Sequence, residues 1–175
     1  MKKLFVAMVM ALAMVMVSSV AFAAQVVELN EAYNVEQTRE AVNSCMPDYL
    51  RFNYPMRRVR SHNDYTLTYV TGNQRDWGLV VYQNEQGYDC CLGMIIPDSE
   101  GIEDAERAGV VLLAAATGKS YNWSDEEKIS PMVETSLNAF KYGKCSFYCK
   151  ETHRFYELTP SHKDNRWYLV VIAYV

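Results

Sequence analysis

The sequence predicts an α+β domain with an antiparallel sheet of about five strands and helices packed on one face. Three observations support this prediction. An N-terminal helical segment is followed by three β-rich segments with short turns between them, two helical segments come next, and two more β-rich segments follow. The expected order is therefore α-βββ-αα-ββ, and the short connections favour antiparallel pairing.

The first 23 residues predict a cleaved secretory signal peptide. Two lysines follow the initial Met, residues 4–17 are uncharged and apolar, and residues 21–23 read Ala-Phe-Ala, a small-x-small cleavage signal. A retained membrane anchor is the competing interpretation, because the apolar run approaches the length that spans a bilayer. The cleavage signal and the polar sequence after it favour removal. We expect one domain over residues 24–175, periplasmic or secreted, with no permanent membrane span.

The first helix of this domain is expected to begin after Asn34 and to end at Pro47. Asparagine is a favoured N-cap residue, and Gln37 occupies the position that completes a capping box. Proline cannot continue the helix, so Pro47 marks its end.

Three strands are expected next. Their segments are rich in β-branched and aromatic residues and are separated by turn-forming residues, with Pro97 after the last. The predicted strands cover residues 65–70, 77–82 and 88–96.

Two helices should follow the strands. Residues 102–117 are apolar on all sides beyond their acidic start, which predicts a buried helix. A short turn at residues 124–127 precedes the second helix, which is expected to run from Pro131 to Tyr142 with Gly143 as its cap. Its predicted core residues are Val133, Leu137 and Phe140.

Two further strands complete the predicted sheet. Residues 145–158 alternate, which predicts one strand with a core face and a solvent face. Residues 167–175 are apolar on both faces, as in a central strand.

Charge and motifs exclude several functions. Lys2 and Lys3 leave with the signal peptide, so 15 basic residues remain against 21 acidic ones, which argues against nucleic-acid binding. No signature of a hydrolase, a nucleotide-binding loop or a dinucleotide-binding fold occurs. The acidic stretch at residues 98–106 does not match a calcium loop and fits a helix start better. We therefore name no catalytic residue, cofactor or metal ligand.

Five cysteines remain in the domain, and an oxidising compartment favours disulfide bonds. We expect a bridge from Cys90 to Cys145 or Cys149, with Cys45 taking the other, and Cys91 left as a free thiol. This pairing requires the two strands to lie close together in the sheet. A four-cysteine zinc site is the weaker alternative, because the usual CxxC spacing is missing.

Two surfaces are candidates for contact with a partner. Tyr148, Arg154 and Tyr156 share one face of the predicted 145–158 strand. A basic cluster that includes Arg57, Arg58 and Arg60 could meet an anionic partner, although a solvated connection also explains it.

These features favour an exported, non-enzymatic binding module for another protein, an envelope component or a small ligand. Two alternatives stay open: a secreted hydrolase whose site is assembled from distant segments, and a structural envelope protein that self-associates. The sequence does not indicate an oligomeric state.

Overall fold

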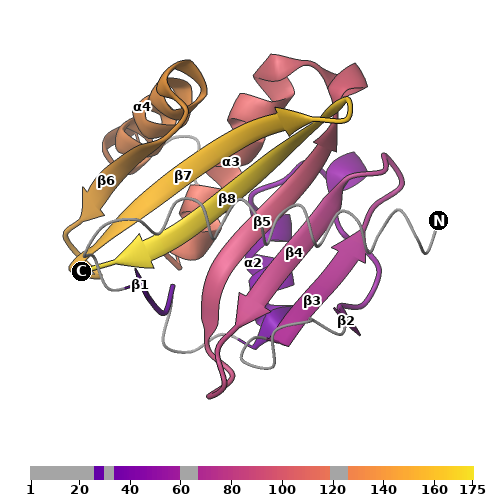
Figure 1. The fold of residues 1–175 in the computed structure, drawn as a ribbon, viewed down its shortest axis with the longest axis horizontal. Coiled ribbons are helices and arrows are strands. Elements are labelled where there is room, and N and C mark those ends of the chain that lie inside the picture. Colours follow the sequence, from indigo (N-terminus) through magenta and orange to yellow (C-terminus); the bar gives the residue numbers. More distant parts are fainter. Residues whose placement is uncertain (1–25, 30–33, 60–66, 119–125) are drawn as a thin grey trace.

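A computed structural model describes residues 26–29, 34–59, 67–118 and 126–175 (Figure 1). Three features predicted from the sequence lie wholly or partly outside these ranges: the signal peptide, Arg60 of the basic cluster, and residues 124 and 125 of the turn before the second helix of the 102–142 pair. Among the helices within them, none combines the length and the apolar character needed to cross a membrane.

The described residues form an α+β fold with a large antiparallel sheet of eight strands and three α-helices. Along the sheet the strand order is β2-β3-β4-β5-β8-β7-β6, and β1 pairs with the end of β8 on the side opposite β7. The strands are β1 (Val26–Val27), β2 (Arg57–Val59), β3 (Leu67–Gly72), β4 (Gly78–Gln83), β5 (Asp89–Pro97), β6 (Cys145–Cys149), β7 (Arg154–Lys163) and β8 (Arg166–Tyr174). The fold class is therefore confirmed, whereas the five-strand count and the element order are corrected.

The predicted 145–158 strand is two strands. A turn at residues 150–153 ends β6 and folds β7 back against it, with Tyr148 opposite Phe155. His153 adopts a positive φ of 54° in this turn, a conformation that a continuous strand does not contain. The β-prone residues on both sides of the turn concealed it in the sequence.

The placement of β8 agrees with its apolar character on both faces. It pairs with β5 along one side and with β7 along the other. Leu169 and Val171 face the helices, whereas Tyr168 and Val170 belong to a second buried apolar cluster on the opposite face of the sheet. A strand buried on both faces needs apolar side chains at every position, as the sequence shows.

The three helices are α2 (Val35–Ser44), α3 (Ile102–Ala116) and α4 (Glu126–Tyr142), and all lie on one face of the sheet (Figure 1). The predicted capping box of α2 is present. Asn34 Oδ1 accepts hydrogen bonds from the backbone N–H groups of Glu36 and Gln37, and Gln37 Oε1 accepts one from Asn34 N at 3.0 Å.

Helix α4 begins earlier than the sequence predicts. Pro131 lies inside it rather than at its first position. Proline lacks an N–H, so the helix loses one backbone hydrogen bond there. Buried residues beyond it, including Met132 and Ala139, fix the helix against the rest of the core.

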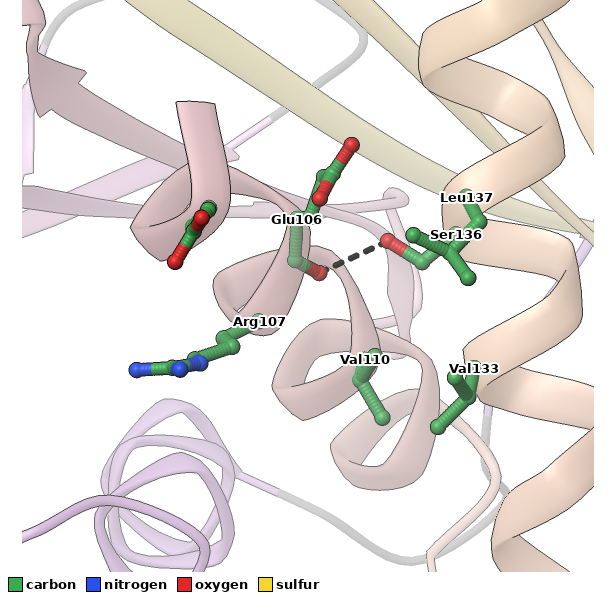
Figure 2. A pocket seen from close by; sticks show the side chains of 7 residues that line it. Glu106, Arg107, Val110, Val133, Ser136 and Leu137 are labelled. Carbon is green, nitrogen blue, oxygen red and sulfur yellow. Dashed lines mark hydrogen bonds between the residues drawn. The ribbon is translucent and has the colours of Figure 1, made fainter. Parts of the chain in front are cut away.

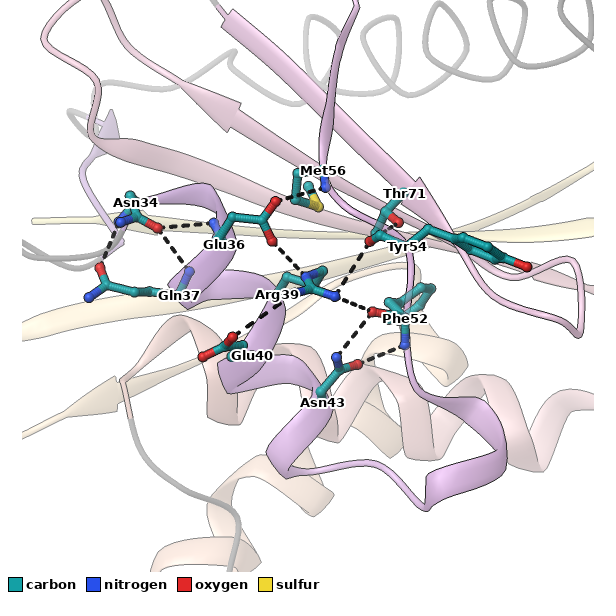
Figure 3. A network of polar contacts seen from close by, with 10 residues as sticks. All are labelled: Asn34, Glu36, Gln37, Arg39, Glu40, Asn43, Phe52, Tyr54, Met56 and Thr71. Carbon is teal, nitrogen blue, oxygen red and sulfur yellow. Dashed lines mark hydrogen bonds and ion pairs between the residues drawn. The ribbon is translucent and has the colours of Figure 1, made fainter.

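Helix α2 also holds the segment that leads into β2 (Figure 3). Asn43 bonds both backbone groups of Phe52, donating to its carbonyl at 3.2 Å and accepting from its N–H at 2.8 Å. Arg39 donates to the Phe52 carbonyl at 2.8 Å, and Glu36 accepts from Met56 N at 3.0 Å. These polar contacts attach an irregular segment to the helix while the Phe52 ring is fully buried.

Candidate functional site

The cysteines do not form the predicted bridges. All five lie in the described part of the chain, and no disulfide bond joins any two of them. Cys90 is in β5, whereas Cys145 and Cys149 are in β6, and strands β8 and β7 lie between. Three strand spacings amount to roughly 14 Å, about twice the Cα separation that a disulfide tolerates.

A β-bulge also changes which face Cys90 occupies. Tyr82 pairs with Cys91 and Gln83 pairs with Asp89, so Cys90 is the extra residue. As a result Cys90 and Cys91 both contact the apolar cluster on the sheet face away from the helices. Burial raises the pKa of the Cys90 thiol to about 11 and that of Cys91 well above its usual value, so neither is a ready nucleophile near neutral pH.

The turn between β6 and β7 separates the three residues predicted to share one contact surface. Tyr148 is 46% exposed on the face of the sheet away from the helices. Tyr156 is completely buried among the residues that pack against the helices, and its hydroxyl donates to Leu29 O at 3.1 Å. Arg154 donates to Glu28 O at 2.6 Å. Neither Arg154 nor Tyr156 therefore belongs to a surface with Tyr148.

The structure brings two other aromatic residues beside Tyr148. Phe155 of β7 is 41% exposed, and its ring centroid lies 5.1 Å from that of Tyr148 and 5.5 Å from that of Tyr174 in β8. The Phe155 and Tyr174 rings are nearly parallel, at 9°. We call Tyr148, Phe155 and Tyr174 the aromatic row, because they cross three adjacent strands.

Polar contacts hold both ends of the aromatic row. The Tyr148 hydroxyl lies 3.1 Å from His153 Nδ1 in the β6–β7 turn, and the Tyr174 hydroxyl donates to Ser146 Oγ at 3.0 Å. Each ring therefore packs against another ring, with Tyr148 tilted at 53° to Phe155, and each tyrosine has a hydrogen-bond partner. The aromatic row is a rigid, partly exposed surface.

The alternation of side chains along β7 could have identified Phe155 as an outer-face residue. Within one continuous strand Phe155 shares a face with the core residue Phe147, so it was not a surface candidate. With β7 starting at Arg154, its register across from Tyr148 places it on the outer face. Tyr174 could be found only from the pairing of β7 with β8.

A pocket of about 360 Å³ lies between α3 and α4 (Figure 2). Val110, Val133 and Leu137 supply its apolar lining, and Glu103, Glu106 and Arg107 supply charge.

Two polar groups of this pocket are already engaged. Ser136 also lines it, and its hydroxyl donates to Glu106 O at 2.7 Å. Arg107 lies 3.6 Å from Asp104, so an ion pair already engages its positive charge. The pocket suits an apolar group but contains no paired nucleophile and base.

The predicted basic cluster is only partly described. Arg57 and Arg58 are exposed on β2, the strand at one end of the sheet. Within the described ranges, no three His, Cys, Asp or Glu side chains are grouped so that they could hold a metal ion.

A buried carboxyl group lies between α2 and the sheet. Asp89 is 2% exposed, accepts a hydrogen bond from Thr38 Oγ1, and accepts another from Gln83 Nε2 at 2.8 Å. Burial raises its pKa, and the two hydrogen bonds only partly oppose this. The contacts of Asp89 fix the start of α2 against β4 and β5.

This carboxyl group makes stability depend on pH. Because the pKa of Asp89 is higher in the folded chain than its ordinary 3.8, the folded state holds the proton where the unfolded state has lost it. Stability should therefore fall as pH rises from that value through the raised one. We expect Asp89→Asn to flatten this decline and to raise the melting temperature at neutral pH, measured by circular dichroism between about pH 4 and pH 7.

Asp48→Asn is the matched control, since the Asp48 side chain is almost fully exposed. It should leave the pH profile of the melting temperature close to that of the wild type. A profile for Asp89→Asn that also matches the wild type would show that Asp89 does not determine this dependence.

Comparisons of this chain with protein-family models, with curated proteins and with solved structures found no match in any of the three.

Proposed function

We propose that this protein is an exported, non-enzymatic binding module that contacts a partner protein through the aromatic row. The observation that carries the proposal is the exposure of Tyr148 and Phe155 on a sheet face where Tyr82 and Tyr168 are buried. Aromatic side chains gathered at one exposed place are enriched at protein interfaces, where they bury much area for few rotatable bonds.

The geometry of the aromatic row suits a protein surface better than a flat ring ligand. Phe155 lies between its two neighbours, stacked on Tyr174 and tilted at 53° to Tyr148, so one face of its ring is already covered by Tyr174. Its rotamer is fixed before binding, which lowers the entropy lost on association. The tyrosine hydroxyls offer polar contacts at the two ends.

Site-specific photocrosslinking in the native cells tests the proposal. Tyr148 is replaced by p-benzoylphenylalanine, and Tyr142 is replaced in the same way as a control. Tyr142 is an exposed tyrosine on α4, in the helical layer. We expect Tyr148→p-benzoylphenylalanine to give a defined adduct with another protein, with a yield about fivefold above that of the control, because binding energy concentrates in a small part of a surface.

Equal adducts at both positions, or none at position 148, would contradict the proposal. An adduct with the mass of two copies of this chain would favour self-association instead. Circular dichroism of both variants checks that the fold is retained.

A further inference from the structure

We infer that the partner binds as an extended segment that adds to the free edge of β6, with acidic residues on either side of an uncharged stretch. This inference rests on the proposed function and names the partner's chemistry. The juxtaposition that supports it is an uncharged edge strand between two lysines, and this strand contains Tyr148 of the aromatic row.

The two ends of the sheet differ in how they resist strand addition. At one end, β2 is three residues long and has two exposed arginines, Arg57 and Arg58. Short length and charge are the usual protection of an exposed edge. At the other end, β6 reads Cys-Ser-Phe-Tyr-Cys, without a charge or a proline. The five residues of β6 themselves lack this protection.

The backbone of β6 is available on one side. Among the described strands, β6 pairs with β7 alone, over the whole range from Cys145 to Cys149. An edge strand leaves the N–H and C=O groups of every second residue unpaired, and an extended segment satisfies them by forming another ladder. The segment's outward side chains would lie beside Tyr148, within about 5.5 Å between Cβ atoms.

Charge decides which segment fits. Lys144 and Lys150 lie directly before and after β6, and both are exposed. Lys144 is 3.4 Å from Glu157, and Glu151 accepts a hydrogen bond from Cys149 Sγ at 3.4 Å. The Lys144 side chain stays 58% exposed beside Glu157, so a strand along β6 would still meet one lysine at each end, and acidic residues at both ends of the added strand would stabilise the pairing.

The same charges argue against a second copy of this chain as the added strand. An antiparallel pair of β6 strands centred on Phe147 would place Lys144 of one copy opposite Lys150 of the other, at both ends. Like charges directly opposite each other destabilise strand pairing. A segment from a different protein avoids this repulsion.

Two synthetic peptides test the inference on the purified protein. Both contain five alternating threonine and valine residues, one with glutamate at each end and the other with lysine. We expect the glutamate peptide to bind about tenfold more tightly at low salt, and hydrogen exchange of the β6 amides to slow on binding. In the K144E/K150E variant this preference should reverse.

The matched control is R57E/R58E, which makes the same charge change on β2 at the other end of the sheet. It should leave the preference for the glutamate peptide unchanged. Failure of both peptides to bind, loss of preference in R57E/R58E alone, or binding without protection of β6 amides would overturn the inference. If Tyr148 still crosslinks to a partner in cells, the proposed function survives such a failure.

Discussion

Replacing Gly109 with alanine should destabilise the protein by about 2 kcal/mol, because an overpacking cost of about 3 kcal/mol exceeds the gain of about 1 kcal/mol from the better helix former. A Cβ atom at position 109 would lie 2.5 Å from Ser136 Oγ and 2.8 Å from Leu158 Cδ2. Helices α3 and α4 and strand β7 meet at this point. Relief requires Ser136 to turn away from its hydrogen bond to Glu106 O and the fully buried Leu158 side chain to repack. Urea denaturation of the wild type and the Gly109→Ala variant measures the change in the free energy of unfolding.

The double variant Gly109→Ala/Ser136→Ala tests the stated cause. It removes the hydroxyl that is nearest to the added atom, so the double variant should lose less stability than the two single variants together. Ser136→Ala alone should cost about 1 kcal/mol, since it removes the hydrogen bond to Glu106 O. A Gly109→Ala protein as stable as the wild type would show that α3 and α4 are not in such close contact.

Leu113→Ala should cost about 3 kcal/mol, because Leu113 is fully buried in α3 and its truncation leaves a cavity. The matched control is Leu137→Ala on α4. Leu137 belongs to the core stripe predicted from the sequence, but it is 49% exposed beside the α3–α4 pocket. Its truncation should cost less than about 1 kcal/mol.

Thermal and urea denaturation of the two alanine variants provide the comparison. Similar losses of stability in both variants would mean that Leu137 is as buried as Leu113 in solution. Leu137 would then not line an open pocket between α3 and α4. A small loss in Leu113→Ala alone would indicate that the helical layer is loosely packed.

Local signals in the sequence predicted several elements correctly. Asn34 and Gln37 predicted the start of α2, because capping depends on residues three positions apart. The apolar run of α3 predicted burial, since a helix without a polar face cannot lie on the surface. These features need no knowledge of the neighbouring strands.

Features that depend on strand register were not accessible in the same way. The alternation on both sides of residues 150–153 continues smoothly in the sequence, so the turn was missed and Tyr156 was expected on the wrong face. The bulge at Cys90 likewise shifts one residue against its partner strand, and a shift of one residue exchanges the two faces. The predicted disulfide bonds failed for this reason and because β8 and β7 separate β5 from β6.

The residues of the candidate site also differ in whether local sequence signals or strand pairing identify them. Tyr148 was identified from alternation within its own strand, and the structure places it on an exposed face. Phe155 and Tyr174 become its neighbours only through pairing across three strands. The lysines on either side of β6 indicate a binding edge only when β6 is known to be the last strand of the sheet.

The position of β8 bears on the order in which the chain can fold. Ribosomes make β8 after the seven other strands that the structure describes, yet it joins β5 of one meander to β7 of the other. Until it emerges, the two groups of strands have no shared ladder, and each exposes an apolar face. Such non-local pairing slows folding and leaves aggregation-prone intermediates. A chain with this topology completes its native sheet only after β8 has been synthesised. A chaperone that covers the nascent strands until then should raise the yield of folded protein.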